Sequence, residues 1–405
     1  MSSFFFFGTI MGIYASINAY LFVRLWLTLA GSGPLRGVAC ALLLLFALCF
    51  PLGRIFEDRL PHLLAEVILV MGSLYIAPMI YGFLLTLLSD TLRLVNYSVS
   101  LTPMPPPFTV SGRVRVVAAV FALSLFISLL GAINARLPGV RSETVASFTA
   151  RAGNTSMLRI AVLSDIHLGR MVGNGHLEKL VGLINERNPD LVLMAGDIID
   201  DTEWIDDEQE VARTRELLSS LRPRLGVWAV PGNHEYYAGI DRSIGLLADS
   251  GVRVLRDEWA LLDEGDGIGG YLLVGRDDRS AARFGASRRT LADILEEAKS
   301  LRPGLAKLPV ILMDHQPFHL DEAEEAGVTL QVSGHTHRGQ IFPFNFVVSS
   351  LYECPYGLYK WGKTWYYVSS GAGTWGPPVR TTGRPEIVMI SLAFGADASR
   401  AVGSD

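Results

Sequence analysis

The stretch Leu163-Ser164-Asp165-Ile166-His167-Leu168-Gly169 decides how the rest of the chain is interpreted. It begins at the last residue of an apolar run, residues 158–163, which is interrupted only by Arg159. This run predicts a largely buried β-strand. Asp165 and His167 stand two residues apart at the end of that strand, so their side chains are expected to point the same way. A carboxylate and an imidazole on one side of a strand end predict half of a metal site.

Charge is unevenly distributed over the 405 residues. Residues 1–150 contain nine arginines, no lysine and five acids, whereas the remaining 255 residues hold 26 basic and 35 acidic side chains. Half of all residues are hydrophobic, which is high for a soluble protein. We therefore expect a membrane part followed by an acidic soluble part, and no binding of nucleic acid through a basic surface. The three cysteines imply neither a disulfide framework nor a cysteine-based metal site.

Four apolar runs precede the soluble part. They cover residues 4–23, 37–53, 63–88 and 116–134. Each is close to the ~20 residues that a helix needs to cross a bilayer. Buried core helices of a large soluble domain are the alternative, but amphipathic partners to cover them are missing from the sequence. We predict a transmembrane region of about four helices over residues 1–135, without a removed signal peptide.

The side of the membrane on which the soluble part lies is not readable from the arginines. Those on its side are Arg54, Arg59, Arg136, Arg141 and Arg151, and those on the other are Arg24, Arg36, Arg93, Arg113 and Arg115. Because the two groups are equal, the positive-inside rule leaves the side undecided, with a slight preference for the cytoplasm. Residues 136–157 lack strong periodicity and are expected to form a tether.

From residue 158 the pattern is that of an α/β domain. Short apolar runs predict strands at 158–163, 191–195, 226–230, 252–255, 271–274 and 310–313, and amphipathic stretches predict helices at 175–187, 207–221, 243–250 and 289–300. This alternation is typical of βαβ units. After Thr329 the helical signal fades, and strands are expected to dominate up to Leu392.

Five of the strand ends carry Asp, Asn and His in short motifs. These are Asp165-Ile166-His167, Gly196-Asp197-Ile198-Ile199-Asp200, Gly232-Asn233-His234-Glu235, Asp314-His315-Gln316-Pro317 and Gly334-His335-Thr336-His337. In α/β sheets ligands gather at such ends. Carboxylate, amide oxygen and imidazole together suit manganese, iron or zinc. A glycine directly before three of the motifs lets the backbone and a metal approach closely.

Each motif alone also has a structural interpretation. Asp-X-His could be a strand-end turn, and Gly-Asp-X-X-Asp commonly begins a helix. His315 could be a structural histidine satisfied by its neighbours. His335 and His337 form the strongest single motif, because two imidazoles at this spacing usually bind something. The ordered set of five is far more specific than its parts and predicts a metal site.

The five motifs, intact and in order, resemble the signature of the calcineurin-like metallophosphoesterases. The resemblance covers roughly residues 157–393, and segments 356–359, 367–371, 373–374 and 384–387 are similar to the membrane-associated bacterial branch of that family. Ser370 departs from this branch, whose members often have arginine there. The resemblance implies a catalytic domain over residues 158–393 with two mixed sheets flanked by helices, and it leaves 394–405 as a C-terminal tail.

The resemblance also implies two divalent metal ions, with manganese favoured over iron and zinc. One ion would be held by Asp165, His167, Asp197 and His337, and the other by Asp197, Asn233, His315 and His335. Such a pair of cations lowers the pKa of a bridging water, and the resulting hydroxide attacks phosphorus. His234 is assigned to neither ion, so it would act as general acid and stabilise the transition state.

The implied function is hydrolysis of a phosphomonoester, phosphodiester or pyrophosphate bond. The expected partners are a phosphorylated small molecule or lipid and the membrane itself, because a tether beside a bilayer brings lipid-linked phosphates within reach. The alternative is a membrane-anchored metal-binding sensor or scaffold without turnover. A transporter is poorly supported, since the predicted spans carry only one acid, Glu66.

Two further groups of side chains can each be interpreted in two ways. The basic group, Arg276, Arg279, Arg283, Arg288 and Arg289, either contacts a phosphate or forms a solvated or membrane-facing patch. The aromatic group, Trp361, Trp365, Tyr366, Tyr367 and Trp375, either lines a lipid groove or packs within strands. His176 is expected to be structural, and His319 to support the site only as a minor alternative. Asp200 and Glu235 are expected to cap turns.

Overall fold

The computed structural model describes residues 3–56, 59–99, 110–147, 157–263 and 270–394. The chain forms two compact units, one of Met1–Ile133 with Gly376–Val379 and one of Asn134–Trp375 with Arg380–Asp405. Residues 395–405 of the predicted tail and 148–156 of the predicted tether lie outside the described residues.

The first unit is built from four long helices, as the four apolar runs predict. They are α1 (Ser3–Thr28), α2 (Pro34–Phe56), α3 (His62–Val99) and α4 (Val110–Ala135). All four are long and apolar enough to cross a membrane. Helix α3 continues beyond the predicted run and therefore carries a second acid, Asp90. The carboxylate of Asp90 accepts a hydrogen bond from Tyr20 at 2.7 Å and pairs with Arg24, which offsets the cost of placing it in an apolar helix.

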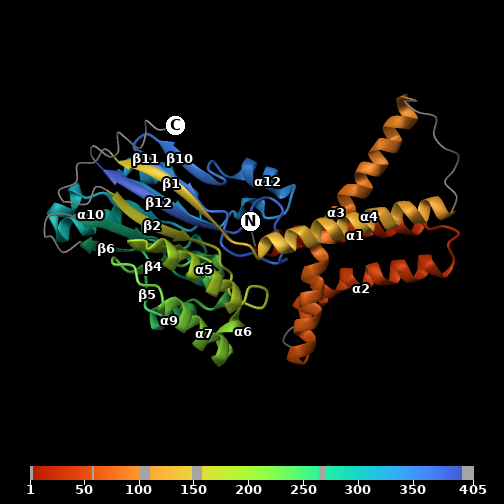
Figure 1. Cartoon of the computed structure of the whole chain (residues 1–405), viewed down its shortest axis with the longest axis horizontal. Coiled ribbons are helices and arrows are strands. Elements are labelled where there is room, and N and C mark those ends of the chain that lie inside the picture. Colours follow the sequence, from red (N-terminus) through yellow and green to blue (C-terminus); the bar gives the residue numbers. More distant parts are fainter. Residues whose placement is uncertain (1–2, 57–58, 100–109, 148–156, 264–269, 395–405) are drawn as a thin grey trace. The chain divides into compact units, whose positions relative to one another are not determined.

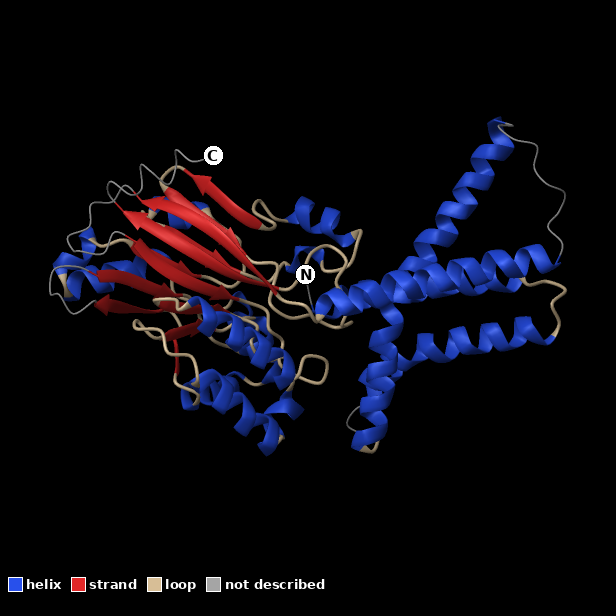
Figure 2. Ribbon diagram, viewed as in Figure 1, coloured by secondary structure: helices blue, strands red, loops and turns tan. Residues whose placement is uncertain are grey.

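The second unit contains two six-stranded mixed sheets, shown in red in Figure 2. The first sheet has the order β1 (Gly139–Ser147), β12 (Glu386–Phe394), β2 (Met157–Leu163), β3 (Leu191–Ala195), β4 (Val227–Val230) and β5 (Val252–Val254). The second has the order β10 (Gly357–Trp361), β11 (Thr364–Val368), β9 (Leu330–Ser333), β8 (Val310–Met313), β7 (Gly270–Gly275) and β6 (Glu258–Asp263). The predicted architecture of two mixed sheets is confirmed.

The second unit also contains helices, several of which pack on the outer faces of the two sheets. Those in the first half of the unit are α5 (Asn174–Arg187), α6 (Thr202–Asp206), α7 (Glu208–Ser219), α8 (Asn233–Ala238) and α9 (Ile240–Asp249). Those in the second half are α10 (Leu291–Leu301), α11 (Asp321–Glu325) and α12 (Phe344–Leu351), with the short 3₁₀ helices η2 (Arg279–Phe284), η3 (Pro303–Lys307) and η4 (His337–Gly339).

Alternating side chains along β2 explain how the layers are held together. Leu158, Ile160 and Val162 belong to the core between the two sheets, whereas Ala161 and Leu163 belong to the core beneath the helices of the first sheet. Successive side chains of a strand point to opposite faces, so a strand buried on both faces is apolar throughout. A third core joins the second sheet to α10 and α11.

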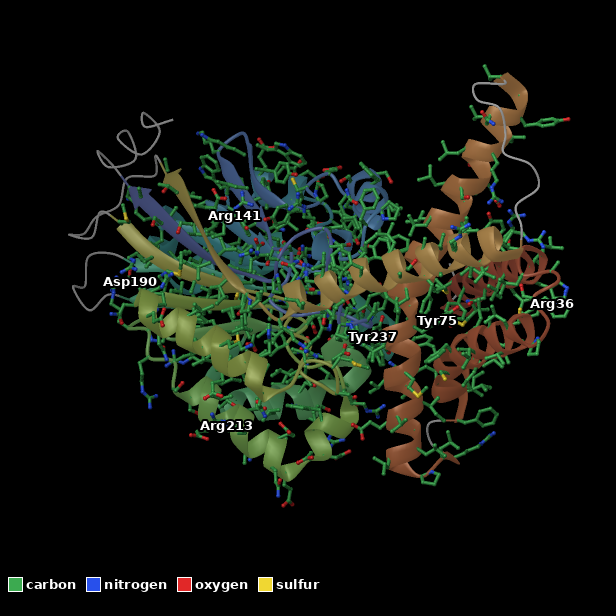
Figure 3. The ribbon with its side chains drawn as sticks, turned by 45° about the vertical axis from the view of Figure 1, so that its right-hand side comes forward. Arg36, Tyr75, Arg141, Asp190, Arg213 and Tyr237 are labelled. Carbon is green, nitrogen blue, oxygen red and sulfur yellow. The ribbon has the colours of Figure 1, made fainter. Side chains whose placement is uncertain are left out.

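The predicted tether over residues 136–157 is wrong in its first part. Gly139–Ser147 forms β1, which pairs in parallel with β12 along its whole length. The strand lies at the edge of the sheet, and residues 141–144 are four consecutive polar residues, so it gives little hydrophobic signal. Arg141 of β1, labelled in Figure 3, donates a hydrogen bond to the Tyr356 hydroxyl at 2.7 Å and thereby ties this edge to the unit.

Candidate metal centre

The predicted metal ligands lie after the carboxyl ends of neighbouring strands. β2, β3 and β4 run parallel in the first sheet, and β8 and β9 run parallel in the second. Parallel strands end at the same edge, so the loops that follow them meet there. Three overlapping groups of ligand atoms result, each lying within 4.8 Å: Asp165, His167 and His337; His167, Asp197 and His234; and Asp197, His315 and His335.

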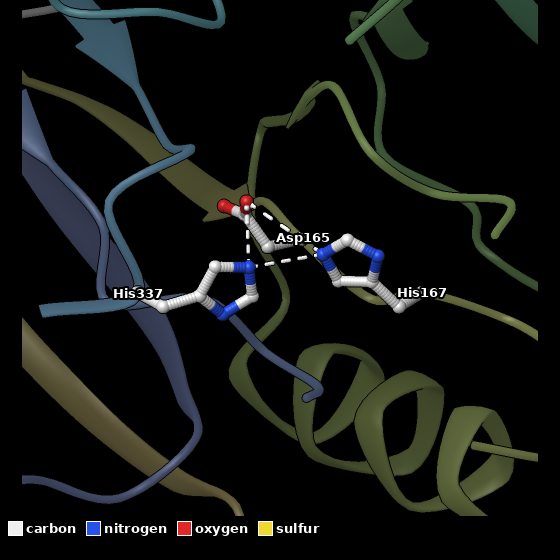
Figure 4. Close-up of side chains that lie close together, drawn as sticks. All are labelled: Asp165, His167 and His337. Carbon is white, nitrogen blue, oxygen red and sulfur yellow. Dashed lines mark hydrogen bonds and ion pairs between the residues drawn. The ribbon is translucent and has the colours of Figure 1, made fainter. Parts of the chain in front are cut away.

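The first group joins the motif after β2 to the motif after β9 (Figure 4). His337 Nε2 lies 3.3 Å from Asp165 Oδ1 and 3.0 Å from His167 Nε2. His167 Nε2 lies 3.9 Å from Asp165 Oδ1. Two ligands at right angles about a common ion, each ~2.1 Å from it, are about 3 Å apart. These three side chains are therefore spaced as ligands of one cation would be.

Asp197 lies between the first group and the third. Its Oδ2 lies 3.9 Å from His167 Nε2 and 3.1 Å from His315 Nε2. The other carboxylate oxygen, Oδ1, accepts the backbone N–H of His234 at 2.8 Å. Asn233 stands between Gly232 and His234, which both contact Asp197. The structure thus brings all seven predicted ligands to one edge of the domain, with Asp197 in the middle.

Five of these residues have a left-handed backbone. Their φ angles are 53° for Asp165, 53° for His167, 52° for Asp197, 70° for His335 and 48° for His337. A non-glycine residue in this region costs of the order of 1–2 kcal/mol. Such strain concentrates at functional sites, where it directs side chains that a relaxed turn would point elsewhere.

Two histidines are oriented by hydrogen bonds from their Nδ1 atoms. Nδ1 of His167 lies 2.9 Å from Asp200 Oδ1, and Nδ1 of His315 lies 2.8 Å from the carbonyl oxygen of Ala195. In the neutral ring, each acceptor keeps the proton on Nδ1, so Nε2 is the nitrogen whose lone pair can bind a metal. Asp200 was expected to cap a turn, so its role in orienting His167 is a correction.

Glu235 organises the backbone around Asp197. Its carboxylate is fully buried and accepts the N–H groups of Asp197, Ile198, Ile199 and Gly232 at 2.6–2.9 Å. Burial and the neighbouring Asp197 carboxylate raise the pKa of Glu235, while the four N–H groups favour its charged form. Glu235 does cap a turn, as expected, and the turn it fixes is the one that positions Asp197.

Replacing Glu235 by alanine should destabilise the domain strongly. Four buried N–H groups would lose a charged acceptor, which we expect to lower the free energy of unfolding by about 3–5 kcal/mol. Thermal unfolding of the purified chain measures the effect. Glu296→Ala removes an exposed carboxylate and is the matched control. Equal melting temperatures for the two variants would contradict the structural role of Glu235.

At two glycines beside the predicted ligands, a side chain of any size would clash with neighbouring atoms. A Cβ atom on Gly232 would lie 2.2 Å from Asp197 Oδ1, and one on Gly334 would lie 1.7 Å from Ser164 Oγ and 2.2 Å from Asp165 Oδ2. Both glycines directly precede predicted ligands. They allow the loops of the two sheets to approach the carboxylates closely enough for a shared cation.

The histidines of the centre differ in their affinity for protons. Burial lowers the pKa of His335 to about 4 and holds the pKa of His337 well below its usual range. Burial acts in the same direction on His315, but the Asp197 carboxylate outweighs it and raises the pKa of His315 well above its usual range. Burial alone would raise the pKa of Asp197, but His315 and His234 hold it well below the usual value. Two neutral imidazoles and an ionised carboxylate are in the forms that bind a metal.

His234 is held at the rim of the centre by Asp200. Its Nδ1 lies 2.5 Å from Asp200 Oδ1, and its ring centroid is 4.6 Å from that of His167. Burial would lower the pKa of His234, but Asp197 and Asp200 outweigh it and raise this pKa to about 9. Tyr237, labelled in Figure 3, and Trp375 stand beside the ring at 5.3 and 6.2 Å.

The donor set fits divalent metal ions. Among the described residues, Asn233 Oδ1 is buried without a hydrogen-bond partner, and the buried His315 Nε2 lies 3.1 Å from Asp197 Oδ2. An unpaired polar atom in the interior is costly, and one that lies among candidate metal ligands implies a ligand that completes it. Oxygen and imidazole donors together suit manganese, iron or zinc.

The basic group is divided between buried Arg276 and exposed Arg283, with the other three arginines partly exposed. Arg276 is buried, pairs with Glu322 at 2.6 Å and lies 3.5 Å from Asp314, which also pairs with Arg288. Arg289 pairs with Glu297. A solvated patch is therefore wrong for Arg276, because acids distant in sequence neutralise it.

The aromatic group is divided. Tyr366 and Tyr367 are buried in β11, and Trp365 donates a hydrogen bond to the carbonyl of Ala146 at 2.9 Å. Strand packing therefore accounts for these three. Trp375 is different, because 55% of its surface is exposed beside His234.

Two further histidines of the second unit lie apart from the ligand groups. Nε2 of His176 lies 2.6 Å from the carbonyl oxygen of Ala372, which agrees with the expected structural role. His319 is exposed and belongs to none of the three groups.

Arg380 is a functional neighbour that the sequence did not reveal. It is fully buried, and burial lowers its pKa to about 10. Its guanidinium donates to the carbonyl oxygens of Gly371, Gly373, His337 and Ser370. Ser370, which stands where relatives often have arginine, is buried and contributes its carbonyl to this contact. Arg380 thus fixes the loop of His337 from behind.

Comparisons with known proteins agree on the family of this domain. The sequence model of the calcineurin-like phosphoesterases matches residues 158–339. A Danio rerio protein named as a transmembrane protein with metallophosphoesterase domain is 29% identical over 343 residues, which cover 83% of this chain and 75% of that protein. An uncharacterised metallophosphoesterase of Aquifex aeolicus is 32% identical over 62% of this chain and 92% of its own length. One of Helicobacter pylori is 35% identical over 58% of this chain and 60% of its own length.

The chain therefore belongs to the calcineurin-like phosphoesterase family. It carries a metal-dependent phosphoesterase domain, whose fold implies a dinuclear site for divalent metals. The four apolar helices and the transmembrane relative make it a membrane protein.

Proposed function

We propose that this chain hydrolyses a phosphomonoester, phosphodiester or pyrophosphate bond in a membrane lipid, using two divalent cations. The observation that supports it most is the convergence of Asp197 and six other candidate ligands, among which Asn233 presents a buried oxygen without a partner. Manganese is the ion we favour, because the centre combines carboxylates with imidazoles and lacks thiolates.

We assign the ligands to two ions that share Asp197. Asp165, His167 and His337 would hold one ion, and Asn233, His315 and His335 would hold the other. The spacing of the first three, the unpaired oxygen of Asn233 and the 3.1 Å between His315 Nε2 and Asp197 Oδ2 support this division. Asp197 reaches both groups through Oδ2.

Bound divalent ions at this place would activate water and stabilise the charge that develops on the phosphoryl oxygens. The protein itself supplies the proton for the leaving group. Asp200 fixes His234 through Nδ1. Nε2 is then the atom that can donate a proton to the leaving oxygen as its bond to phosphorus breaks.

An apolar rim beside His234 supports a lipid substrate. Tyr237, Phe284 and Trp375 are each about half exposed, at 49%, 53% and 55%. Tyr237 contacts both the His234 ring and the Phe284 ring. Aromatic side chains that remain exposed beside a catalytic group suit a leaving group with apolar character.

Hydrolysis of bis-p-nitrophenyl phosphate by the purified full chain tests the reaction class. We expect manganese to stimulate release of p-nitrophenol and EDTA to abolish it, because the attacking water needs a metal to ionise near neutral pH. Incubation with membrane lipid extracts, scored by mass spectrometry, tests the substrate class. We expect loss of a phosphate-containing group from one lipid species.

The opposite result has a defined meaning. A chain that holds two metals per molecule but cleaves neither the chromogenic ester nor any lipid phosphate would contradict the proposal. It would favour the membrane-anchored sensor or scaffold. Activity on the ester without activity on lipids would retain the reaction and exclude the lipid substrate.

A further inference from the structure

One exposed segment of the second unit has the apolar composition that is usual for a protein interior. Residues 342–351, named here the apolar segment, comprise Phe342, Pro343 and all of α12. The segment carries no charged residue. Its exposed apolar side chains are Phe342 at 46%, Phe344 at 44%, Phe346 at 64%, Val347 at 50% and Leu351 at 66%. None of the side chains of α12 is buried. A contiguous exposed patch of this kind marks an interaction surface.

The apolar segment is built onto the metal centre. Helix η4, which carries His337, ends at Gly339. A Cβ atom on Gly339 would lie 2.4 Å from the backbone nitrogen of Asn345, in the first turn of α12. The loop that carries a proposed ligand and the apolar helix are therefore in direct backbone contact. Any surface that holds α12 also lies close to the metal centre.

The same part of the domain is where the chain arrives from α4. Asn134, at the end of α4, donates hydrogen bonds to the carbonyl oxygens of Arg380 and Gly383 at 3.0 and 2.8 Å. Thr381 in turn donates its N–H to the carbonyl of Gln340 at 2.9 Å, and its hydroxyl accepts the N–H of Phe342 at 2.9 Å. A short series of hydrogen bonds thus connects the end of the last apolar helix to the start of the apolar segment.

Covalent geometry limits how far this region can lie from the bilayer. Three residues separate the end of α4 at Ala135 from the start of β1 at Gly139. Even fully extended, they reach only about 15 Å, whereas the headgroup region adds of the order of 5–8 Å to each side of the hydrocarbon core. The part of the domain that carries Asn134 therefore stays within reach of the lipid headgroups.

Basic side chains accompany the apolar ones. Arg338 and Arg384 are exposed, and Arg338 lies beside Gly383, where a Cβ atom would be 3.4 Å from its Nη1. An apolar helix with phenylalanines and adjacent arginines is typical of segments that lie in the membrane interface. The arginines would contact headgroup phosphates while the phenylalanines enter the acyl region.

We propose that the apolar segment inserts into the interface of the bilayer that holds the four spans, as a second membrane contact of the catalytic domain. This contact keeps the metal centre at the level of headgroup phosphates. Insertion itself does not depend on the reaction. Only its benefit for catalysis depends on the proposed function.

Depth-dependent fluorescence quenching tests the contact directly. The full chain carrying Phe346→Cys is labelled with an environment-sensitive fluorophore and reconstituted into vesicles of phosphatidylcholine and phosphatidylglycerol. Spin-labelled lipids should quench this probe about twofold, because an inserted side chain lies within the upper acyl region. The three native cysteines are buried, and the unsubstituted chain measures their background labelling.

Ser300→Cys is the matched control. Ser300 is exposed near the end of α10, which lies at the opposite end of the domain from α12 (Figure 1). Its probe should report water and show no quenching. If the Phe346→Cys probe behaves like the Ser300→Cys probe, the proposal is overturned. Cross-linking of two Phe346→Cys chains without lipid quenching would also overturn it and would make the segment an interface between copies.

A double substitution separates this proposal from the proposed function. Phe346→Asp with Val347→Asp should lower hydrolysis of vesicle-embedded substrate by about tenfold or more, since two charges oppose insertion. Hydrolysis of bis-p-nitrophenyl phosphate by the same protein should not change. If the unsubstituted chain cleaves neither substrate, the proposed function fails, whereas lipid quenching of the Phe346→Cys probe still decides the contact.

Discussion

Asp197→Ala should remove both metal ions and nearly all activity. Asp197 Oδ2 faces His167 on one side and His315 on the other, so its loss leaves two incomplete ligand sets. Bound cations contribute several kcal/mol to stabilising the transition state, and each 1.4 kcal/mol is a factor of ten, so turnover should fall by at least about 10³-fold. Metal content measured by mass spectrometry should fall in parallel from two ions per chain.

The control for this substitution is Asp249→Ala, which removes an exposed carboxylate paired with Arg215. It should keep both ions and full turnover. Thermal unfolding shows whether the Asp197 variant remains folded, and Asp197→Asn, which preserves the shape of the side chain, provides a second measurement. Loss of a single ion in a folded variant would show that Asp197 does not bridge the two.

His234→Asn should keep both ions and reduce turnover by about 10²–10⁴-fold, the usual contribution of a general acid. Asparagine fills part of the same space but cannot give up a proton. The loss should depend on the leaving group. It should be large for an alkyl phosphate ester, whose oxygen needs a proton to depart, and smaller for the p-nitrophenyl ester, which departs as a stabilised anion.

His319→Asn is the matched control, because His319 is an exposed histidine in the same left-handed conformation that asparagine tolerates. It should leave turnover unchanged for both esters. Loss of metal from the His234 variant would make His234 a ligand, which its place in a group with His167 and Asp197 would then explain. An equal loss on both esters would exclude proton donation.

The strands and the motifs after them were predictable from the sequence because both signals are local. Leu191–Ala195 and Val310–Met313 are apolar runs buried on both faces, and their boundaries agree with the prediction. The glycines before Asp197, Asn233 and His335 marked places of close approach, and a Cβ atom would indeed clash there. The grouping of these motifs follows from parallel strands ending at one edge.

The side chains that orient the centre could not be predicted, because their partners are distant in sequence. Asp200 contacts Nδ1 of both His167 and His234, and Arg380 donates a hydrogen bond to the carbonyl oxygen of His337. Neither contact produces a short sequence motif with a recognisable spacing. Strand β1 and helix α12 were missed for another reason. The conformation of both elements depends on what lies beside them. Hydrophobic periodicity detects only elements that bury one face within their own domain.

The position of β12 in its sheet has a consequence for biosynthesis. β12 lies between β1 and β2, so β1 has no partner until the last strand of the domain has been translated. Nearly 240 residues separate β1 from that partner along the chain. A ribosome that stops before residue 386 would release a membrane-anchored chain with two exposed strand edges where β12 belongs. Completion of the catalytic domain is therefore a late event of translation, and premature termination near the C-terminus should yield an insoluble rather than a partly active product.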